Sequence, residues 1–564
     1  MAKRVEARRD EADELVFLAL GGLGEIGMNC YLYGFGPPES RQWLMADLGI
    51  TFPEGEDDPG IDVILPDVRF AEAERNALAG LVITHAHEDH IGAVLELWPR
   101  LGCPIYCTPF AAGMLRTKRA DFGGARDMPI KVVPLDGRFK AGPFDVELVS
   151  MAHSIPETSG LVIRTSLGRI FHTADWKLDS EPYIGKKIDE GRYARLGDEG
   201  LLALVCDSTN AMRDGRSPSE TDVARSLAGI IAKAPHRVVV TTFSSNVARI
   251  KAVAEAAQKA GRHLVVAGRA MHRVIEVAIE TGYLPQDFAY SDQREFQNIE
   301  RSMTVCLCTG SQGEPNAAMA RIAELSHPDI KLAKGDLVIF SSRTIPGNEK
   351  AVGYIQNELV LQGCDVLSDG EALVHVTGHP RRDELKDMYR WTRPRIAIPM
   401  HGEARHLKAH AALARAAGAG LVVPAINGEI VRLAPGEPRI VDDAPVGRLF
   451  RDGALIVPSD NGPVRERRKL AVVGICVISL AMSRKGELVS EPRIVLDGVP
   501  TENSDGELME DIAFSALEGA LKGMPPARRR DPEALAESLR RAVRSELAAA
   551  WGKKPICKVL IHVV

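Results

Sequence analysis

The sequence predicts an α/β fold followed by a small α+β domain, and three observations support this. Apolar runs typical of buried strands lead through polar loops into helix-like segments, as in residues 81–98, 238–246 and 337–347. Acidic or histidine residues stand at the ends of several of these runs, where open α/β sheets place their sites. After about residue 470 come strand-like runs, helices at about 513–522 and 532–551, and a final strand at 558–563. We therefore expect several domains, the last of about 100 residues, a usual domain size.

The composition is that of a globular protein, with 45% hydrophobic and 26% charged residues among 564. Disordered and fibrous classes are therefore excluded. The formal net charge of -6 excludes a globally basic nucleic-acid coat. An RNA or DNA site would need a local basic channel.

Cysteine usage and the lack of long apolar segments favour the cytoplasm. The nine cysteines are scattered, and Cys103, Cys107, Cys306 and Cys308 are more typical of core thiols than of a zinc ribbon. The N-terminus has no apolar segment of a signal peptide. The longest apolar run, residues 470–482, is shorter than the roughly 20 residues that a bilayer requires, so we expect a buried strand there and no membrane association.

One predicted strand-to-helix turn holds four side chains of metal-binding type. His85 and His87 follow the apolar run 81–83 and, being two positions apart, project to the same side of an extended chain. Asp89 and His90 fall where the chain turns into the next helix, so they can face a shared centre. Imidazole suits zinc, manganese and iron-like ions, and a carboxylate adds a hard oxygen ligand. This spacing indicates a metal site rather than a solvated loop.

The other ligands must come from elsewhere in the chain, and several strand ends supply candidates. Strand-like runs end at Asp47, His153, Asp175 and Asp207. Each alone is more typical of a turn, but their recurrence at strand ends favours one common site. Asp47 is interpreted either as a turn residue or as a group that orients the histidines through hydrogen bonds.

Three strand–loop–helix units follow residue 209, with small polar loops at 241–246, 309–315 and 341–347. Helix N-termini of this kind can bind anions through free backbone N–H groups, although ordinary capping by serine is the alternative for any one loop. Histidines then return at His375, His379 and His401. Residues 446–470 are predicted to be a linker because they are rich in Pro, Gly and charged residues.

Taken in this order, the motifs resemble the metallo-β-lactamase superfamily. The insertion between Asp207 and His375, with the late His401, resembles its β-CASP nuclease branch, and residues 309–315, 375–379 and 399–403 resemble bacterial ribonuclease J. The resemblance covers nearly the whole chain and weakens toward the C-terminus. It implies a metallo-β-lactamase αββα sandwich with an inserted β-CASP α/β domain and a small C-terminal α+β domain. The expected domains are 1–208 and 366–445 for the sandwich, 209–365 for the β-CASP domain, 446–470 for the linker and 471–564 for the C-terminal domain.

The resemblance also implies two divalent metal ions per subunit, Zn2+ or Mn2+. The implied ligands are His85, His87 and His153 for one ion, Asp89, His90 and His401 for the second, and Asp175 as a bridge between them. Two such cations can generate hydroxide at neutral pH and clamp a phosphodiester during in-line displacement.

His379 is the candidate general acid for the leaving oxygen. By resemblance Asp207 is its partner, because a carboxylate would hold the imidazole in place and favour its protonated form. The alternative is that Asp207 only caps a turn.

The function implied is a metal-dependent ribonuclease that degrades RNA from the 5′ to the 3′ end, prefers 5′-monophosphate ends and also cuts internally. Its expected roles are rRNA processing and mRNA decay in the cytoplasm, as a homodimer or homotetramer joined through the C-terminal domain and in contact with other RNA-decay proteins. A hydrolase of small esters or thioesters is the second interpretation, disfavoured because it needs no inserted domain with three anion-type loops. An RNA-binding scaffold with a degenerate site is the third, disfavoured because no expected ligand is missing.

Two sets of residues are expected to contact RNA. The residues expected to hold RNA phosphates are Phe243, Ser244, Ser245, His375, Val376, Thr377, Gly378 and His379. The residues expected to form a pocket for the 5′-phosphate are Gly310, Ser311, Gln312, Gly313 and Glu314, with Ser341, Ser342 and Arg343. Glycine lets backbone N–H groups approach a phosphate closely, and an arginine can add a bidentate pair. The alternative is a plain strand–helix connection in which Pro315 begins the helix.

Overall fold

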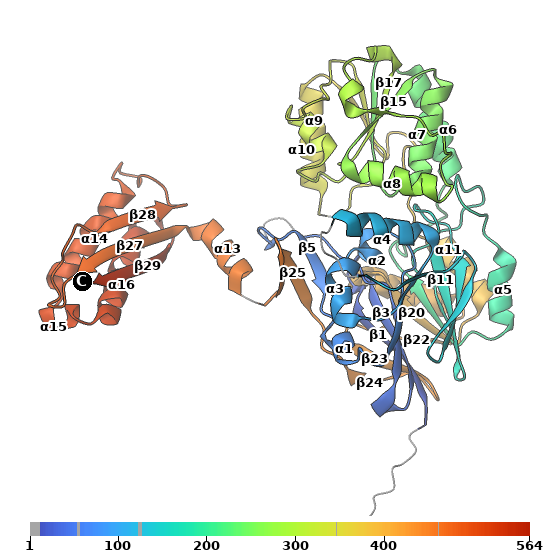
Figure 1. Cartoon of the computed structure of the whole chain (residues 1–564), viewed down its shortest axis with the longest axis horizontal. Coiled ribbons are helices and arrows are strands. Elements are labelled where there is room, and N and C mark those ends of the chain that lie inside the picture. Colours follow the sequence, from blue (N-terminus) through green and yellow to red (C-terminus); the bar gives the residue numbers. More distant parts are fainter. Residues whose placement is uncertain (1–11, 54–56, 122–126, 346, 461) are drawn as a thin grey trace, which may run out of the picture. The chain divides into compact units, whose positions relative to one another are not determined.

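The computed structural model describes residues 12–53, 57–121, 127–345, 347–460 and 462–564 (Figure 1). The described residues form two compact units. The first unit contains the described parts of Met1–Thr51 and Ile64–Leu449, and the second contains those of Phe52–Val63 and Phe450–Val564. Each unit has its own hydrophobic core and is described by itself.

Two sheets that share one core form the base of the first unit. One has the strand order β24-β23-β1-β3-β4-β6-β7-β8, the other β22-β20-β13-β12-β11-β10-β9. The first comprises β1 (Glu14–Gly21), β3 (Cys30–Gly36), β4 (Gln42–Ala46), β6 (Leu78–Val82), β7 (Ile105–Cys107), β8 (Ile130–Val132), β23 (Glu429–Ala434) and β24 (Arg439–Asp443). The second comprises β9 (Arg138–Ala141), β10 (Phe144–Ser150), β11 (Ser159–Thr165), β12 (Gly168–His172), β13 (Ala203–Asp207), β20 (Ile396–Met400) and β22 (Leu421–Val422).

The period of two along these strands separates an inner from an outer face. Phe17 of β1 and Leu148 of β10 lie in the core between the sheets, whereas the next residue, Val149, packs on the other side. Three helices cover that outer face: α5 (Glu190–Asp198), α11 (Arg382–Thr392) and α12 (Ala404–Ala416). On the outer face of the first sheet, Phe70 of α1 (Arg69–Ala73) packs edge-on against Trp43 with ring centroids 5.1 Å apart. The layers are therefore helix, sheet, sheet and helix, as expected for the metallo-β-lactamase sandwich.

A second α/β layer is inserted between β13 and β20. Its sheet has the order β16-β15-β17-β14-β18-β19. The strands are β14 (Val238–Thr241), β15 (His263–Ala267), β16 (Ser291–Asp292), β17 (Thr304–Cys308), β18 (Leu337–Phe340) and β19 (Asp365–Leu367). The helices are α6 (Glu220–Lys233), α7 (Val247–Lys259), α8 (Arg269–Glu280), α9 (Ala318–Ala323) and α10 (Glu349–Leu361). All its pairings are parallel, and Thr241 pairs with Cys308 on one side and Phe340 on the other. The polar loops that follow these three residues therefore start side by side at one sheet edge.

The second unit is a three-stranded sheet packed on two helices. Its strands are β28 (Arg493–Asp497), β27 (Ile475–Met482) and β29 (Ile556–Val563), and its main helices are α14 (Met509–Gly523) and α16 (Pro532–Trp551). Every second residue of β27 is buried, and these residues share a core with Ala513 of α14 and Leu539 of α16. Asp531 caps α16 by accepting hydrogen bonds from two backbone amides. The predicted helices and the final strand are confirmed here.

Residues 446–482 differ from the sequence-based expectation. The stretch expected to be a linker contains β25 (Arg448–Asp452), β26 (Leu455–Pro458) and much of α13 (Gly462–Val473). The charges that suggested a linker form ion pairs instead, Arg467 with Asp452 at 2.6 Å and Arg468 with Asp58 at 3.0 Å. The apolar run 470–482 is not one strand but is split between α13 and β27 at Gly474, whose φ of 61° favours glycine.

The predictions about cysteines and membrane spans can be compared with this structure. All nine cysteines are buried and unpaired by disulfides, as predicted for core thiols. Among the described residues, no helix is long and apolar enough to cross a membrane.

Candidate metal centre and active site

The histidine turn is built by two neighbouring strand ends. Strands β4 and β6 run parallel with Ala46 beside Val82, so Asp47 and Thr84 leave the sheet together. The Asp47 carboxylate accepts hydrogen bonds from the backbone N–H and the hydroxyl of Thr84, both at 2.8 Å. Helix α2 (Glu88–Ile91) starts directly after His87 and turns His90 back toward the strands. The strand-to-helix turn predicted from the sequence is therefore confirmed.

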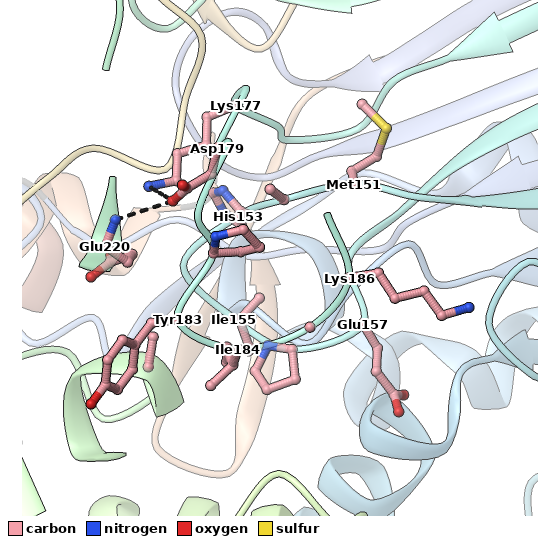
Figure 2. A pocket seen from close by; sticks show the side chains of 15 residues that line it. Met151, His153, Ile155, Glu157, Lys177, Asp179, Tyr183, Ile184, Lys186 and Glu220 are labelled. Atoms are coloured by element: carbon pink, nitrogen blue, oxygen red, sulfur yellow. Dashed lines mark hydrogen bonds and ion pairs between the residues drawn. The ribbon is translucent and has the colours of Figure 1, made fainter. Parts of the chain in front are cut away.

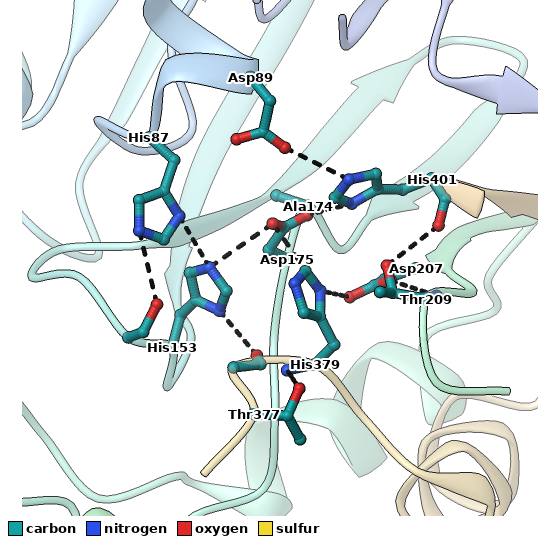
Figure 3. A network of polar contacts seen from close by, with 12 residues as sticks. His87, Asp89, His153, Ala174, Asp175, Asp207, Thr209, Thr377, His379 and His401 are labelled. Atoms are coloured by element: carbon teal, nitrogen blue, oxygen red, sulfur yellow. Dashed lines mark hydrogen bonds and ion pairs between the residues drawn. The ribbon is translucent and has the colours of Figure 1, made fainter. Parts of the chain in front are cut away.

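The first group of candidate ligands is three imidazoles and a carboxylate, those of His85, His87, His153 and Asp175. Figure 3 shows His87, His153 and Asp175 of this group. His87 Nδ1 lies 3.1 Å from His85 Nε2 and 3.0 Å from His153 Nε2. Asp175 Oδ2 lies 3.7 Å from His85 Nε2 and 3.5 Å from His153 Nε2. These three nitrogens converge on one point, as ligands of a single ion do.

The neighbours of each histidine determine which nitrogen carries its proton. His153 Nδ1 donates to the carbonyl of Gly378 at 2.7 Å, so in the neutral ring Nε2 keeps its lone pair. The hydroxyl of Thr84 donates to Asp47, so it can only accept from His85 Nδ1 at 3.0 Å. The lone pair of His85 Nε2 is therefore also left for a cation.

The second group contains Asp89, His90, His401 and again Asp175. His90 Nδ1 donates to Asp47 at 2.7 Å, which leaves Nε2 facing Asp175 Oδ2 at 3.3 Å. His401 Nδ1 donates to Asp175 Oδ1 at 2.7 Å, whereas its buried Nε2 has no hydrogen-bond partner and lies 3.4 Å from Asp89 Oδ2. A buried imidazole nitrogen left without a partner, beside two carboxylates, fits a metal ligand.

The structure therefore brings together the residues that the sequence singled out. The seven expected ligands fall into two groups that share Asp175, and Asp47 orients the histidines through Thr84 and His90. Asp47 has a left-handed φ of 63° at the point where the chain leaves β4. Ala174 and His401 have positive φ as well, at 51° each. Such backbone strain outside glycine is typical of functional sites.

The pKa values divide the imidazoles into two classes. Burial lowers the pKa of His85 and His153 well below the usual value and that of His87 to about 4. Burial also opposes charge on His401, but the carboxylates, Asp175 first, outweigh it and raise its pKa to about 10. Without a cation, the second group therefore retains a proton that a metal would displace.

His379 lies beside both groups and is held by Asp207. His379 Nδ1 donates to Asp207 Oδ2 at 2.8 Å and lies 3.9 Å from Asp175 Oδ2. Burial disfavours the charged imidazole, but Asp207 and then Asp175 outweigh burial and raise the pKa of His379. The Asp207 carboxylate also accepts from Thr209 N at 2.8 Å, so it caps a turn and holds the imidazole at once. The His379 side chain remains 21% exposed and can be reached by a substrate.

A pocket beside His153 contains a buried charge pair (Figure 2). Lys177 Nζ lies 3.1 Å from Asp179 Oδ2, and that carboxylate oxygen accepts from Glu220 N at 3.1 Å. Glu220 pairs in turn with the fully buried Arg249 at 2.9 Å. These contacts connect the segment after Asp175 to the starts of helices α6 and α7.

The expected RNA-contacting segments lie in different settings. Phe243, Ser244 and Ser245 follow β14 and are partly exposed. The stretch from His375 to His379 is held by polar contacts. Directly before it, the Val374 carbonyl accepts from Arg249 at 2.6 Å and from Ser341 at 2.7 Å. Within it, the Thr377 hydroxyl accepts from Asn210 at 2.8 Å. Burial lowers the pKa of His375 to about 3, so this imidazole stays neutral.

The loop expected to hold a 5′-phosphate is cross-linked to its neighbour. The Gln312 amide donates to Arg343 O at 2.9 Å and accepts from Ile345 N at 2.8 Å. Gly310 and Gly313 have φ of 107° and 80°, which explains glycine at both positions. The Glu314 carboxylate accepts from Gln312 N at 3.0 Å. Arg343 is exposed, whereas Ser341 is fully buried and its hydroxyl is bonded to Val374.

Two asparagines in the site were not predicted. Asn29 Nδ2 lies 3.0 Å from Asp89 O and 3.1 Å from His90 Nε2. Asn210 Nδ2 donates to Thr377 Oγ1 and, at 3.2 Å, to His379 O. The partners of both asparagines are distant along the chain, by 60 positions for Asp89 and 169 for His379, so no local spacing pointed to either residue.

Fold and site together define a metal-dependent hydrolase of the metallo-β-lactamase class. Four family models match the chain: "Beta-lactamase superfamily domain" at residues 58–193, "Ribonuclease J, beta-CASP domain" at 235–359, "Zn-dependent metallo-hydrolase RNA specificity domain" at 370–424 and "Ribonuclease J C-terminal domain" at 462–564. Ribonuclease J of Sinorhizobium meliloti is 49% identical over 99% of both chains. Ribonuclease J of Thermus thermophilus is 35% identical over 96% of this chain and 94% of the relative.

The chain belongs to the ribonuclease J family. It is a ribonuclease, a hydrolase that uses divalent metal. A crystal structure of a protein of unknown function from Enterococcus faecalis V583 covers 74% of this chain and 100% of its own, with TM-score 0.51 and 15% identity, and shows the shared fold alone. The fold class and enzyme class predicted from the sequence are confirmed.

Asp175 should be the most sensitive position of the centre. Asp175→Asn or His85→Ala should abolish RNA cleavage and leave a folded protein, because both side chains lie at strand ends. Asp175→Asn should cost more activity than Asp47→Asn, since Asp175 serves both ligand groups whereas Asp47 only orients them. RNA cleavage, bound metal per subunit and circular dichroism check this. Full turnover in the Asp175 variant with unchanged metal would contradict a two-ion centre.

The His379–Asp207 pair should set the alkaline limit of turnover. A general acid acts only while protonated, so activity should fall as the pH rises through the pKa of His379. Asp207→Asn removes the charge that raises this pKa, and the alkaline limb of the kcat profile should therefore move to lower pH. The measurement is the pH profile of kcat for both proteins.

The control for this experiment is His379→Ala. It should lower turnover by about a hundredfold or more with bound metal unchanged, as is usual for loss of a general acid. Loss of bound metal in His379→Ala would show that His379 is a metal ligand. If the alkaline limb of Asp207→Asn does not move, Asp207 does not raise the pKa of the group that limits turnover.

Proposed function

We propose that the protein holds two divalent ions, Zn2+ or Mn2+, and degrades RNA from the 5′ end. The main support for this proposal is that two groups of candidate ligands share Asp175. When bound, such a pair of ions supplies a hydroxide nucleophile at neutral pH and neutralises charge on the scissile phosphate. The donor set fits either metal, because it mixes neutral imidazoles with carboxylate oxygens.

The chain itself would provide orientation and a proton. Gly378, Thr84 and Asp47 fix the tautomers of His153, His85 and His90, so their lone pairs point inward. His379, kept protonated by Asp207, would donate from Nε2 to the leaving oxygen while Nδ1 remains bonded to the carboxylate. Asp175 would hold its bridging position through the hydrogen bond from His401.

RNA would be held by the loop after β14 and by the stretch from His375 to His379. The β14 loop starts helix α7, where free amides favour phosphate, and its Phe243, Ser244 and Ser245 remain partly exposed. Within the second stretch Val376 is buried, and Thr377 and Gly378 hold His379 and His153. RNA that follows this path would reach the metal centre.

A new carboxylate in the β14 loop should weaken RNA binding. Ser245→Asp in a catalytically inactive background should raise the Kd for RNA, because the added charge repels phosphate. Ser326→Asp is the matched control: it is an exposed serine after α9, which runs back from the loop edge of the same sheet. Fluorescence anisotropy over a salt series measures both. Equal affinities at every salt concentration would place this loop away from the RNA path.

We propose further that residues 310–314 and Arg343 bind the 5′-monophosphate. Both glycines have the positive φ that lets amides approach an anion, and Gln312 fixes this loop against Arg343. The Glu314 carboxylate accepts a hydrogen bond from the backbone N–H of Gln312, and this structural role accounts for a carboxylate in a loop that would bind a phosphate. Ser341 would act by holding Val374 rather than by contacting the phosphate. Internal cleavage would use the same centre without this pocket.

Ser311→Ala should reduce the preference for 5′-monophosphate ends. Wild type and variant are compared on 5′-monophosphate, 5′-triphosphate and 5′-hydroxyl RNAs, with and without chelator. The wild type should prefer 5′-monophosphate RNA and lose all cleavage when chelator is added. In Ser311→Ala, the preference for the monophosphate should fall more than the rate of internal cleavage. Equal loss on all three ends would assign the loop to general RNA binding, and chelator-resistant cleavage would contradict metal dependence.

The remaining expectations concern organisation. We propose the domain boundaries 1–208, 209–365, 366–445, 446–470 and 471–564, where 446–470 is a structured connection that contains β25 and β26. We also propose the second unit as the site of dimer or tetramer formation, and a role in cytoplasmic RNA processing and decay with other decay proteins. The separate core of the second unit supports an independent domain. Light scattering of the full chain and of a chain ending before residue 450 tests the assembly.

A further inference from the structure

The first turn of α11 contains a buried carboxylate, Glu384, that the proposed mechanism leaves unused. Its side chain is fully buried. Glu384 Oε1 accepts a hydrogen bond from Leu178 N at 2.8 Å. Glu384 Oε2 accepts two more, from Ser217 N at 3.0 Å and Arg381 N at 2.8 Å. Both carboxylate oxygens are therefore used, and three backbone N–H groups hold the side chain in one place at the start of the helix.

The three amides belong to the segments that carry the reacting groups. Leu178 follows Asp175 by three residues, and Arg381 follows His379 by two. Ser217 lies on the stretch that leaves Asp207, and its hydroxyl donates to the carbonyl of His379 at 3.3 Å. These three segments are far apart in sequence. The Glu384 carboxylate therefore connects the chain near Asp175, near His379 and near Asp207.

A second contact holds the same loop from the Asp207 side. Asn210 Nδ2 donates both to Thr377 Oγ1 at 2.8 Å and to His379 O at 3.2 Å. Between these positions the Gly378 carbonyl accepts from the metal-site residue His153. The loop from Thr377 to Arg381 is thus tied at both ends, and any shift would move the His379 imidazole relative to Asp175.

We propose that Glu384 is a positioning residue that fixes His379 against the metal centre by joining the amides of Leu178, Ser217 and Arg381. The proposal rests on the general-acid role of His379. Neither close relative of glutamate satisfies the geometry. Glutamine would direct an NH2 group at one of the backbone N–H groups, and aspartate is shorter by one methylene and cannot span all three amides.

The test compares Glu384→Gln with Asp383→Asn. Asp383 precedes Glu384 in the same helical turn, is partly exposed and pairs with Lys386 at 2.8 Å. Its loss removes an equal charge near the helix N-terminus without touching the three amides. On 5′-monophosphorylated RNA, Glu384→Gln should lower kcat at least about tenfold with KM and bound metal little changed. Asp383→Asn should match wild type, and Glu384→Asp should recover part of the loss.

A substrate that needs no acid separates positioning from general damage. In the p-nitrophenyl ester of uridine 5′-monophosphate the nitrophenolate leaves without protonation, so the defect of Glu384→Gln should shrink on this substrate, as should that of His379→Ala. The proposal would be overturned if Glu384→Gln had the same defect on both substrates while the defect of His379→Ala shrank on the ester. It would also be overturned if Glu384→Gln cleaved RNA with the kcat of the wild type. An equal defect in His379→Ala would instead reject the acid role of His379 on which the proposal rests. The thermal unfolding curve of each variant shows whether it is folded at the assay temperature, and only folded variants are compared.

Discussion

The structure depends on one electrostatic constraint: Asp175, buried at the end of β12, must be balanced by cations on two sides. Its two oxygens face His85, His90 and His153 in one direction and His401 in another. A buried carboxylate is costly unless it is paired and hydrogen-bonded. Without a metal, the balance requires protons on His90 and His401, whose pKa values are raised by the nearby carboxylates against the effect of burial. Metal binding would replace these protons, so affinity for metal and pH are linked in this site.

The surrounding hydrogen bonds serve this centre by fixing imidazole tautomers. Asp47 does so for His90 directly and for His85 through Thr84, and it is placed to do so because β4 and β6 end side by side. A main-chain carbonyl, that of Gly378, does so for His153. The orientation of one ligand therefore depends on a loop that is distant in sequence and that also carries His379. The proton transfer proposed for His379 would therefore be coupled to metal binding through this loop.

What the sequence could predict follows from the range of the interactions involved. The histidine turn and the strand-end residues His153, Asp175 and Asp207 were predictable because a strand followed by a turn fixes direction within a few residues, and the resemblance assigned them to one site. Glu384 and Asn210 were not, because their partners lie up to 206 and 169 positions away and are mostly main-chain groups without sequence signature. The break at Gly474 in the apolar run 470–482 was not predictable either. Glycine is needed there because the chain passes close to the Asp497 and Gly498 carbonyls, and this is a tertiary contact that composition does not reveal.

The position of the insertion explains how a domain with its own core can act on this chemistry. Strand β13 ends at Asp207, and the chain that returns from the insertion passes this same edge at His379, which is bonded to Asp207, before α11 leads it to the start of β20. The return segment passes Val374, whose carbonyl is bonded to Arg249 and Ser341 of the insertion, before it reaches His379. Arg249 also pairs with Glu220, whose amide bonds to Asp179, four residues beyond Asp175. The loop that carries His379 is therefore attached to the inserted sheet at one end and to the sandwich at the other. If RNA binds along the inserted sheet as proposed, it would act on this loop through Val374, and substrate binding would then have a direct physical route to the position of His379.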